Sequence, residues 1–124
     1  MPNQTVRLSV PAEAGFARTV RMMAASLAVA CDMSVDDVED VRMAAEEGFV
    51  YSCATAPDTC DITFQLSRGT IEAAFSLGAE QASDPDGSLG LAELLLSAVC
   101  DEHGVSDDGT HLRLVKRAGA AHGE

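Results

Sequence analysis

The chain has 124 residues and 47% of them are hydrophobic, so it can bury one core and is too apolar for wholesale disorder. Twenty acidic against eight basic side chains give a formal net charge of −12. Nucleic-acid affinity comes largely from basic side chains that displace counterions, so this charge disfavours direct binding of DNA or RNA. It also disfavours an anionic membrane surface and favours a basic protein surface as the partner.

The four cysteines, Cys31, Cys53, Cys60 and Cys100, fit no zinc framework, because no two of them form a C-x-x-C pair. Cys100 and His103 have a possible ligand spacing, but the second half of such a site is missing, and we expect no metal. The same pair lacks a third orienting group for nucleophilic catalysis. Reduced thiols are typical of cytoplasmic proteins, so we expect four free cysteines and a cytoplasmic location.

The first expected element is a strand over residues 5–10, where polar and apolar side chains alternate until Pro11 ends it. A helix is expected from about residue 13 to residue 30. Its large apolar residues follow steps of four, three and four, at Phe16, Val20, Met23 and Leu27. We expect this stripe to lie in the core. Met22 lies off the stripe, where it would be exposed and available for an interface.

Ser34 is expected to cap a second helix, because an acidic residue three positions later resembles a capping box and two acids lie near the positive end of the helix dipole. One side of this helix continues at Val35, Val38, Val41, Ala45, Phe49 and Ser52. Pro57 closes the segment. A solvated face is expected for the acidic run of Asp36, Asp37, Glu39 and Asp40.

The period then changes to two, and alternation over 62–66 and 71–77 predicts a hairpin that turns at Arg68 and Gly69. A turn at 84–87 precedes a third helix over 89–100. A further turn at 107–109 precedes a last strand, or a strand pair, that includes 111–116.

This order predicts an α+β fold, a two-layer sandwich in which three helices cover one face of a mostly antiparallel sheet of four or five strands. We expect a single domain over residues 1–117 and a flexible tail over 118–124.

A short apolar run before Cys31 allows another interpretation, a lipid-anchored envelope protein cleaved at that cysteine. Ala28 stands where such a signal needs a larger aliphatic residue, and the acidic Glu13 falls in what should be a basic leader. The run is also too short to span a bilayer, so we expect no membrane segment.

Residues 35–47, which read V-D-D-V-E-D-V-R-M-A-A-E-E, resemble the second helix of the bacterial anti-sigma serine kinases. These proteins belong to the GHKL superfamily of ATPases (gyrase, histidine kinase, MutL). The step Val10-Pro11-Ala12 resembles the family's entry into its first helix, and residues 87–91 resemble the G-x-L-G-L box after the nucleotide lid. The resemblance covers residues 5 to about 117 and implies the histidine kinase-like ATPase fold.

In active members of this family, a glutamate of the second helix activates the attacking hydroxyl, and an asparagine one turn later holds Mg²⁺. The resemblance assigns Glu47 the catalytic role, but Tyr51 stands in place of the asparagine. A shift of one residue would use Glu46 and place Val50 there. Neither side chain can replace an amide oxygen as a Mg²⁺ ligand.

The family's D-x-G motif, whose aspartate binds the adenine amine, corresponds to Ser76-Leu77-Gly78, so the glycine is present and the aspartate is absent. Only eight residues, 79–86, separate Gly78 from Gly87, which is short for a lid over a triphosphate. Gly87 and Gly90 could still cradle a phosphate at a helix start. No Lys or Arg lies between Ile71 and Leu112 to offset its charge.

The sequence therefore favours a regulatory protein-binding module that resembles an anti-sigma factor, has lost ATP binding and kinase activity, and needs no cofactor. The resemblance implies a sigma factor or an anti-anti-sigma antagonist as partner, with a homodimer also possible. The alternative is an active ATP-dependent serine kinase with an unusual metal site, which would use ATP and Mg²⁺.

Overall fold

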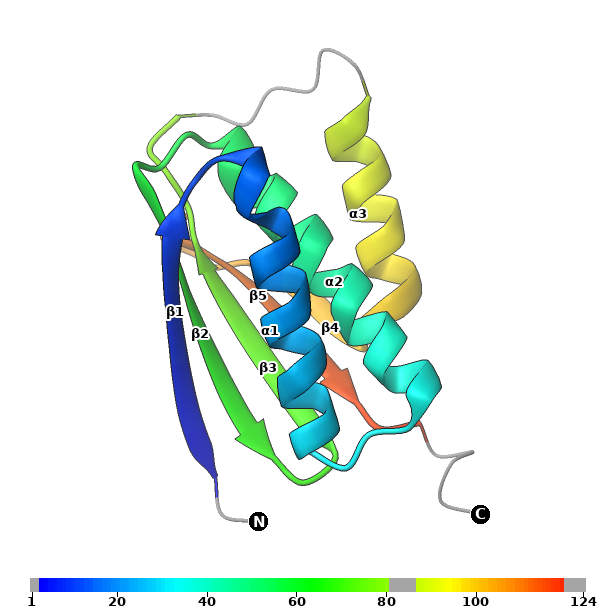
Figure 1. The fold of residues 1–124 in the computed structure, drawn as a ribbon. Coiled ribbons are helices and arrows are strands. Elements are labelled where there is room, and N and C mark those ends of the chain that lie inside the picture. Colours follow the sequence, from blue (N-terminus) through cyan, green and yellow to red (C-terminus); the bar gives the residue numbers. More distant parts are fainter. Residues whose placement is uncertain (1–2, 81–86, 120–124) are drawn as a thin grey trace.

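The computed structural model describes residues 3–80 and 87–119. Within them, three helices lie on one face of a five-stranded sheet, so the expected α+β two-layer architecture is confirmed (Figure 1). All strand pairings are antiparallel, in the order β1-β2-β3-β5-β4. The elements are β1 (Gln4–Pro11), the 3-10 turn η1 (Ala14–Phe16), α1 (Ala17–Ala30), α2 (Val35–Ala54), β2 (Thr59–Ser67), β3 (Thr70–Ser76), α3 (Ser88–Val99), β4 (Glu102–Val105) and β5 (His111–Arg117).

Two of the expected turns are confirmed by their backbone. Gly69 joins β2 to β3 with a φ of +76°, and Gly109 joins β4 to β5 with a φ of +74°. Both values lie in the left-handed region that glycine adopts without a steric penalty. The expected turn at 84–87 lies, except for Gly87, outside the described residues.

The core lies between the helices and the sheet, where Phe49, Phe64 and Phe75 are fully buried. Helix α2 lies close to the sheet at Gly48, because a Cβ atom there would meet the ring of Phe75 at 2.8 Å. Glycine costs about 1 kcal/mol in a helix interior relative to alanine, and here it makes room for the phenylalanine.

The expected core stripe of α1 is wrong in part. Phe16 is 36% exposed because the chain forms the turn η1 there, and Met23 and Leu27 are only half-buried. The buried face of α1 consists of Val20, Ala24 and Ala28 instead. Small side chains at steps of four allow α1 to pack closely against its neighbours. The spacing of the large apolar residues does not predict this face.

Of two further predictions about helix residues, the exposure of Met22 is confirmed and the burial of Val35 is wrong. Met22 is 56% exposed, as expected from its position off the stripe. Val35, expected on the apolar side of α2, is 80% exposed because it is the first residue of that helix.

The acidic run at the start of α2 is not simply a solvated face, because Asp37 is only 2% exposed. Its carboxylate accepts a hydrogen bond from the backbone N–H of Gly119 and lies 3.7 Å from the Lys116 Nζ. Lys116 points from β5 toward the helices and also bonds Asp40 at 3.0 Å. The expected cap is present, since the Ser34 hydroxyl accepts from the backbone N–H of Asp37.

The tail expected to be flexible from residue 118 is held at its start. The backbone N–H of Ala118 donates to the carbonyl of Gly69, and Gly119 is held by Asp37. Residues 120–124 lie outside the part of the chain that the structure describes.

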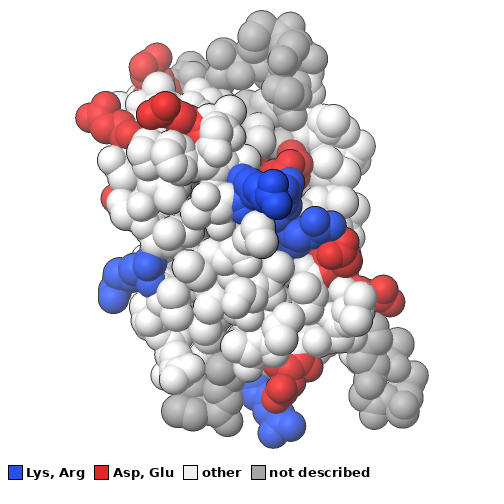
Figure 2. All heavy atoms as spheres, viewed as in Figure 1, with Lys and Arg blue, Asp and Glu red and all other residues white. Residues whose placement is uncertain are grey.

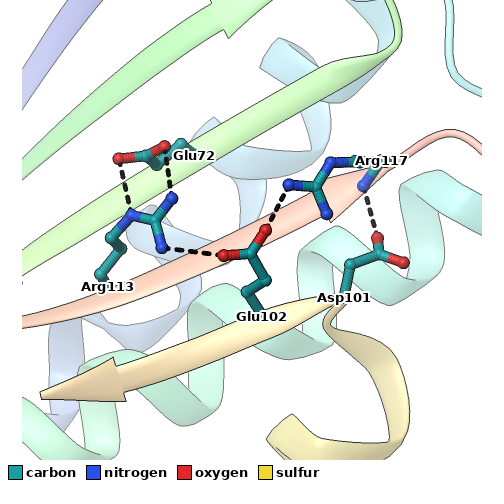
Figure 3. Close-up of polar contacts among 5 residues, drawn as sticks. All are labelled: Glu72, Asp101, Glu102, Arg113 and Arg117. Carbon is teal, nitrogen blue, oxygen red and sulfur yellow. Dashed lines mark hydrogen bonds and ion pairs between the residues drawn. The ribbon is translucent and has the colours of Figure 1, made fainter.

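The open face of the sheet carries a chain of ion pairs that fastens the edge strand β4 (Figure 3). Arg113 forms a two-bond pair with Glu72 on β3 and reaches Glu102 on β4 at 3.2 Å. Glu102 also pairs with Arg117. Val115 lies in register between Glu72 and Glu102 and is only 2% exposed, although it belongs to the open face.

Candidate functional site

The side chains expected to act together on α2, Glu47 and Tyr51, lie on successive turns but line different hollows. Glu47 lines an open hollow between α2 and α3, together with Met43 and Leu95. Tyr51 lines a second hollow, with Glu93 of α3 and His103 of β4. The two side chains therefore share a helix face without facing one enclosed space.

Glu47 has the electrostatic character of a candidate general base. It is half-buried, and burial, followed by the neighbouring charge of Glu46, raises the pKa of its carboxyl above 4.5. Among the described residues no cation pairs with it, whereas Glu46 pairs with Arg21 at 2.9 Å. A half-buried carboxylate without a cation is costly to the fold, and such groups cluster at functional sites.

Replacing Glu47 by glutamine is expected to stabilise the protein at neutral pH. The raised pKa means that the ionised form is less favourable in the folded state than in the unfolded chain, so stability rises as the pH falls through that pKa. The gain from Glu47→Gln should stay below about 1 kcal/mol because water screens the group, and it should vanish below pH 4.5. Urea unfolding at several pH values measures it. Glu46→Gln is the matched control and should give no gain, since it loses the Arg21 pair.

Ser76, which stands in place of the adenine-binding aspartate, lies at the end of β3. Its neighbour Phe75 points into the core, and the Ser76 side chain alternates to the other face of the sheet. There its hydroxyl accepts a hydrogen bond of 2.8 Å from the backbone N–H of Asp61. The structure therefore does not bring this hydroxyl together with Glu47 or Tyr51.

Gly78 fits tightly against the C-terminal end of α2. Its N–H donates to the Thr55 hydroxyl at 2.7 Å, and a Cβ atom at this position would lie 2.1 Å from the Thr55 carbonyl oxygen. The Ser52 hydroxyl donates to the Ser76 carbonyl at 2.7 Å, which joins the same two segments. Contact between protein segments is therefore sufficient to account for a glycine at position 78.

The sequence placed Ser52 on the apolar side of α2 but did not predict its hydrogen bond, and Thr55 was not singled out at all. They are 0% and 5% exposed, and both join α2 to the segment after β3. The available signal was a pair of small hydroxyl residues at the end of an otherwise apolar helix face.

Gly87 and Gly90, which the sequence suggested for phosphate binding, occupy different positions at the start of α3. Gly87 caps α3 with a φ of +80° and has open space around it, whereas Gly90 lies inside the first turn of the helix. The segment considered as a short lid falls mostly outside the described residues. A helix start offers an anion N–H groups and a partial positive charge, but residues 69–112 add no basic side chain to them.

The thiols and histidines do not form a reactive centre among the residues that the structure describes. All four cysteines are free, as expected. Cys31 is completely buried at the end of α1. Burial raises the pKa of Cys100 to about 11, so its thiol is protonated at neutral pH, and the nearest polar contact of the His103 ring is Ser97 at 3.5 Å.

No cluster of three or more His, Cys, Asp or Glu side chains within the described ranges is placed to hold a metal ion. Nor does any helix in these ranges combine the length and the apolar character needed to cross a membrane. No protein-family model matches the chain, and no curated protein is significantly similar to it.

Proposed function

We propose that this chain is a regulatory protein-binding module on a scaffold that resembles the anti-sigma kinases, and that it has lost ATP binding and kinase activity. The observation that supports this most is the contact of Gly78 with the end of α2, because close packing between protein segments can account for this glycine without a role in nucleotide binding. By the resemblance, the partner is a sigma factor or an anti-anti-sigma antagonist in the cytoplasm. The four free thiols are consistent with that compartment.

The distribution of positive charge supports the loss of nucleotide binding. Six of the eight basic side chains form ion pairs, namely Arg21, Arg42, Arg68, Arg113, Lys116 and Arg117. The other two, Arg7 and Arg18, belong to β1 and the start of α1, which are distant from α3 in the sequence. A triphosphate at the start of α3 would therefore meet acidic protein without a basic side chain from residues 69–112.

The kinase alternative is favoured by the position of Glu47, half-buried in the hollow between α2 and α3, where burial raises the pKa of its carboxyl as suits a general base. It would require a metal held without the family's asparagine and an adenine held without its aspartate. ATP and Mg²⁺ would be the cofactors in that case.

Thermal unfolding with nucleotides separates the two functions. A Kd near ~10 μM and ~1 mM ATP–Mg²⁺ would stabilise the fold by about 2.7 kcal/mol, which corresponds to a melting shift of roughly ten degrees. We expect a shift below about two degrees with ATP, ADP or GTP, with or without Mg²⁺. A large shift that Glu47→Ala abolishes would establish the kinase function instead.

If the shift is small, Tyr51→Asn combined with Ser76→Asp shows what prevents binding. Because the Ser76 side chain lies on the sheet face opposite α2, we expect no rescue from this double variant. A rescue would mean that the end of β3 can turn its side chain toward α2 when a nucleotide is present.

A further inference from the structure

Helix α3 has two apolar faces, and the described protein covers only one of them. Leu89, Ala92 and Leu96 are buried on the side that packs against α2. A second apolar stripe, hereafter the α3 stripe, consists of Leu91, Leu94, Leu95 and Ala98. These positions follow the i, i+3, i+4, i+7 spacing of a single helix face. Leu91 is 55% exposed and Leu94 is 67% exposed, so the stripe is open to solvent.

The α3 stripe continues into the hollow between α2 and α3. Leu95 lines this hollow of about 280 Å³ together with Met43 of α2, which is 42% exposed. Charged side chains form the rest of its lining, namely Arg21, Glu39, Asp40, Arg42, Glu46 and Glu47. In the view of the helix layer, basic and acidic side chains lie side by side in its middle, with uncharged surface around them (Figure 2). An apolar strip beside a charged rim is typical of a protein-binding groove.

The charges of the rim are balanced except at one position. Arg21 pairs with Glu46, Arg42 pairs with Glu39, and Lys116 pairs with Asp40. Glu47 is the rim carboxylate for which the described residues provide no cation. A basic side chain supplied from outside would remove the cost of its partial burial.

We propose that the α3 stripe and this hollow bind an amphipathic helix of another protein, whose apolar side covers Leu91 and Leu94 and whose Lys or Arg pairs with Glu47. This proposal rests on the proposed protein-binding function and specifies the chemistry of the partner. A second copy of the chain fits less well, because each copy carries a net charge of −12. The segment that contains α3, residues 69–112, also has no basic side chain to offer to Glu47.

A fluorescein-labelled peptide of leucine and lysine, designed as an amphipathic helix of about 14 residues or four turns, tests this groove. Binding of the peptide is measured by fluorescence anisotropy at ~150 mM salt, because this salt concentration limits long-range attraction to the acidic surface. We expect saturable binding that Leu94→Asp weakens by about tenfold or more, because apolar contact area is lost. Glu47→Gln should weaken it by about threefold, which is the size of one partly screened ion pair.

Val29→Asp is the matched control, since Val29 is a 63% exposed aliphatic residue on α1 that does not line the hollow. Both aspartate variants add one negative charge, so general attraction to the peptide changes equally and only the apolar contact separates them. Equal affinity of Leu94→Asp and Val29→Asp for the peptide would overturn the proposal. Equal binding of a leucine and glutamate peptide would overturn it too.

Sedimentation of the unliganded protein tests whether a second copy of the chain occupies the α3 stripe instead. A dimer that Leu94→Asp dissociates would assign the α3 stripe to a second copy and would contradict the proposed basic helix. The nucleotide experiment distinguishes a failure of this groove from a failure of the proposed function. If neither the peptide nor ATP binds, this groove is wrong while the loss of nucleotide binding stands, whereas a Glu47-dependent ATP shift would overturn the proposed function itself.

Discussion

Lys116→Met is expected to lower the free energy of unfolding by about 3 kcal/mol, because it leaves the buried carboxylate of Asp37 without its cation. The Lys116 side chain is only 15% exposed and the Asp37 side chain 3%, so water compensates little. Asp40 would lose its partner as well, but it is more exposed and contributes less. Urea unfolding monitored by circular dichroism measures the loss, which for a chain of this size corresponds to a melting decrease of about ten degrees.

Arg42→Met is the matched control for this prediction. Arg42 also pairs with a carboxylate of α2, but its side chain is 43% exposed and that of Glu39 is 56% exposed. Pairs of this kind contribute less than about 1 kcal/mol, so this variant should remain close to the original protein. The double variant Lys116→Met with Asp37→Asn should recover part of the loss, since it removes the buried charge that Lys116 no longer offsets. If both single variants have the same small effect, the pair is not buried in solution.

The pH dependence of the Lys116 effect follows from its pKa. Burial alone lowers the pKa of this amine, but the hydrogen bond to Asp40 and the charges of Asp40, Asp37 and Asp101 outweigh it, and the pKa is raised above 10.5. A raised amine pKa stabilises the fold below the unfolded value, and the contribution is lost as the pH rises through the folded value. The difference between the original protein and Lys116→Met should therefore be constant from neutral pH to about 9 and decrease above 10.5.

Gly78→Ala is expected to cost about 3 kcal/mol or to prevent folding, because the added Cβ would lie 2.1 Å from the Thr55 carbonyl oxygen. The atoms that it meets belong to the backbone around Pro57 and Ala56, which cannot rotate away as a side chain could. Thermal and urea unfolding, with the yield of soluble protein, measure the effect. Gly104→Ala is the control, since a Cβ atom there has no neighbour within 4 Å and the change should be nearly neutral.

A gentler variant keeps this prediction testable if Gly78→Ala does not fold. Thr55→Val removes the hydroxyl that accepts the Gly78 N–H and introduces no clash with the backbone. It should cost about 1 kcal/mol, because a part-buried donor loses its partner. A Gly78→Ala protein as stable as the Gly104→Ala control would mean that the end of β3 stands away from α2.

Sequence alone determined the elements whose signals are local. The alternation over β2 and β3, the glycines at the two hairpin turns and the Ser34 cap all depend on residues within a few positions of one another. A strand with one buried face, a left-handed turn or an N-cap each requires a specific residue type at a fixed spacing. The layered α+β architecture followed from the order of these elements, because helices and a one-sided sheet must cover each other's apolar faces.

Other features depend on contacts between distant parts of the chain, and only the tertiary structure decided them. Strand β4 has no apolar alternation and all four of its residues are exposed, so its place at the edge is fixed by pairing with β5 and by the ion pairs of Glu102. Asp37 is buried because Lys116 and Gly119, about eighty residues later in the chain, come to it.

The candidate site also combines features that the sequence predicts with features that only the tertiary structure decides. The sequence could place Glu47 and Tyr51 one turn apart on a helix, because that spacing is local. The alternation over 71–77 also places Ser76 on the face opposite Phe75, but only the packing of α2 against the Phe75 face shows that Ser76 lies away from Glu47 and Tyr51. The contact between Gly78 and Thr55, and the half-burial of Glu47 beside α3, likewise arise only when α2, α3 and the end of β3 pack together.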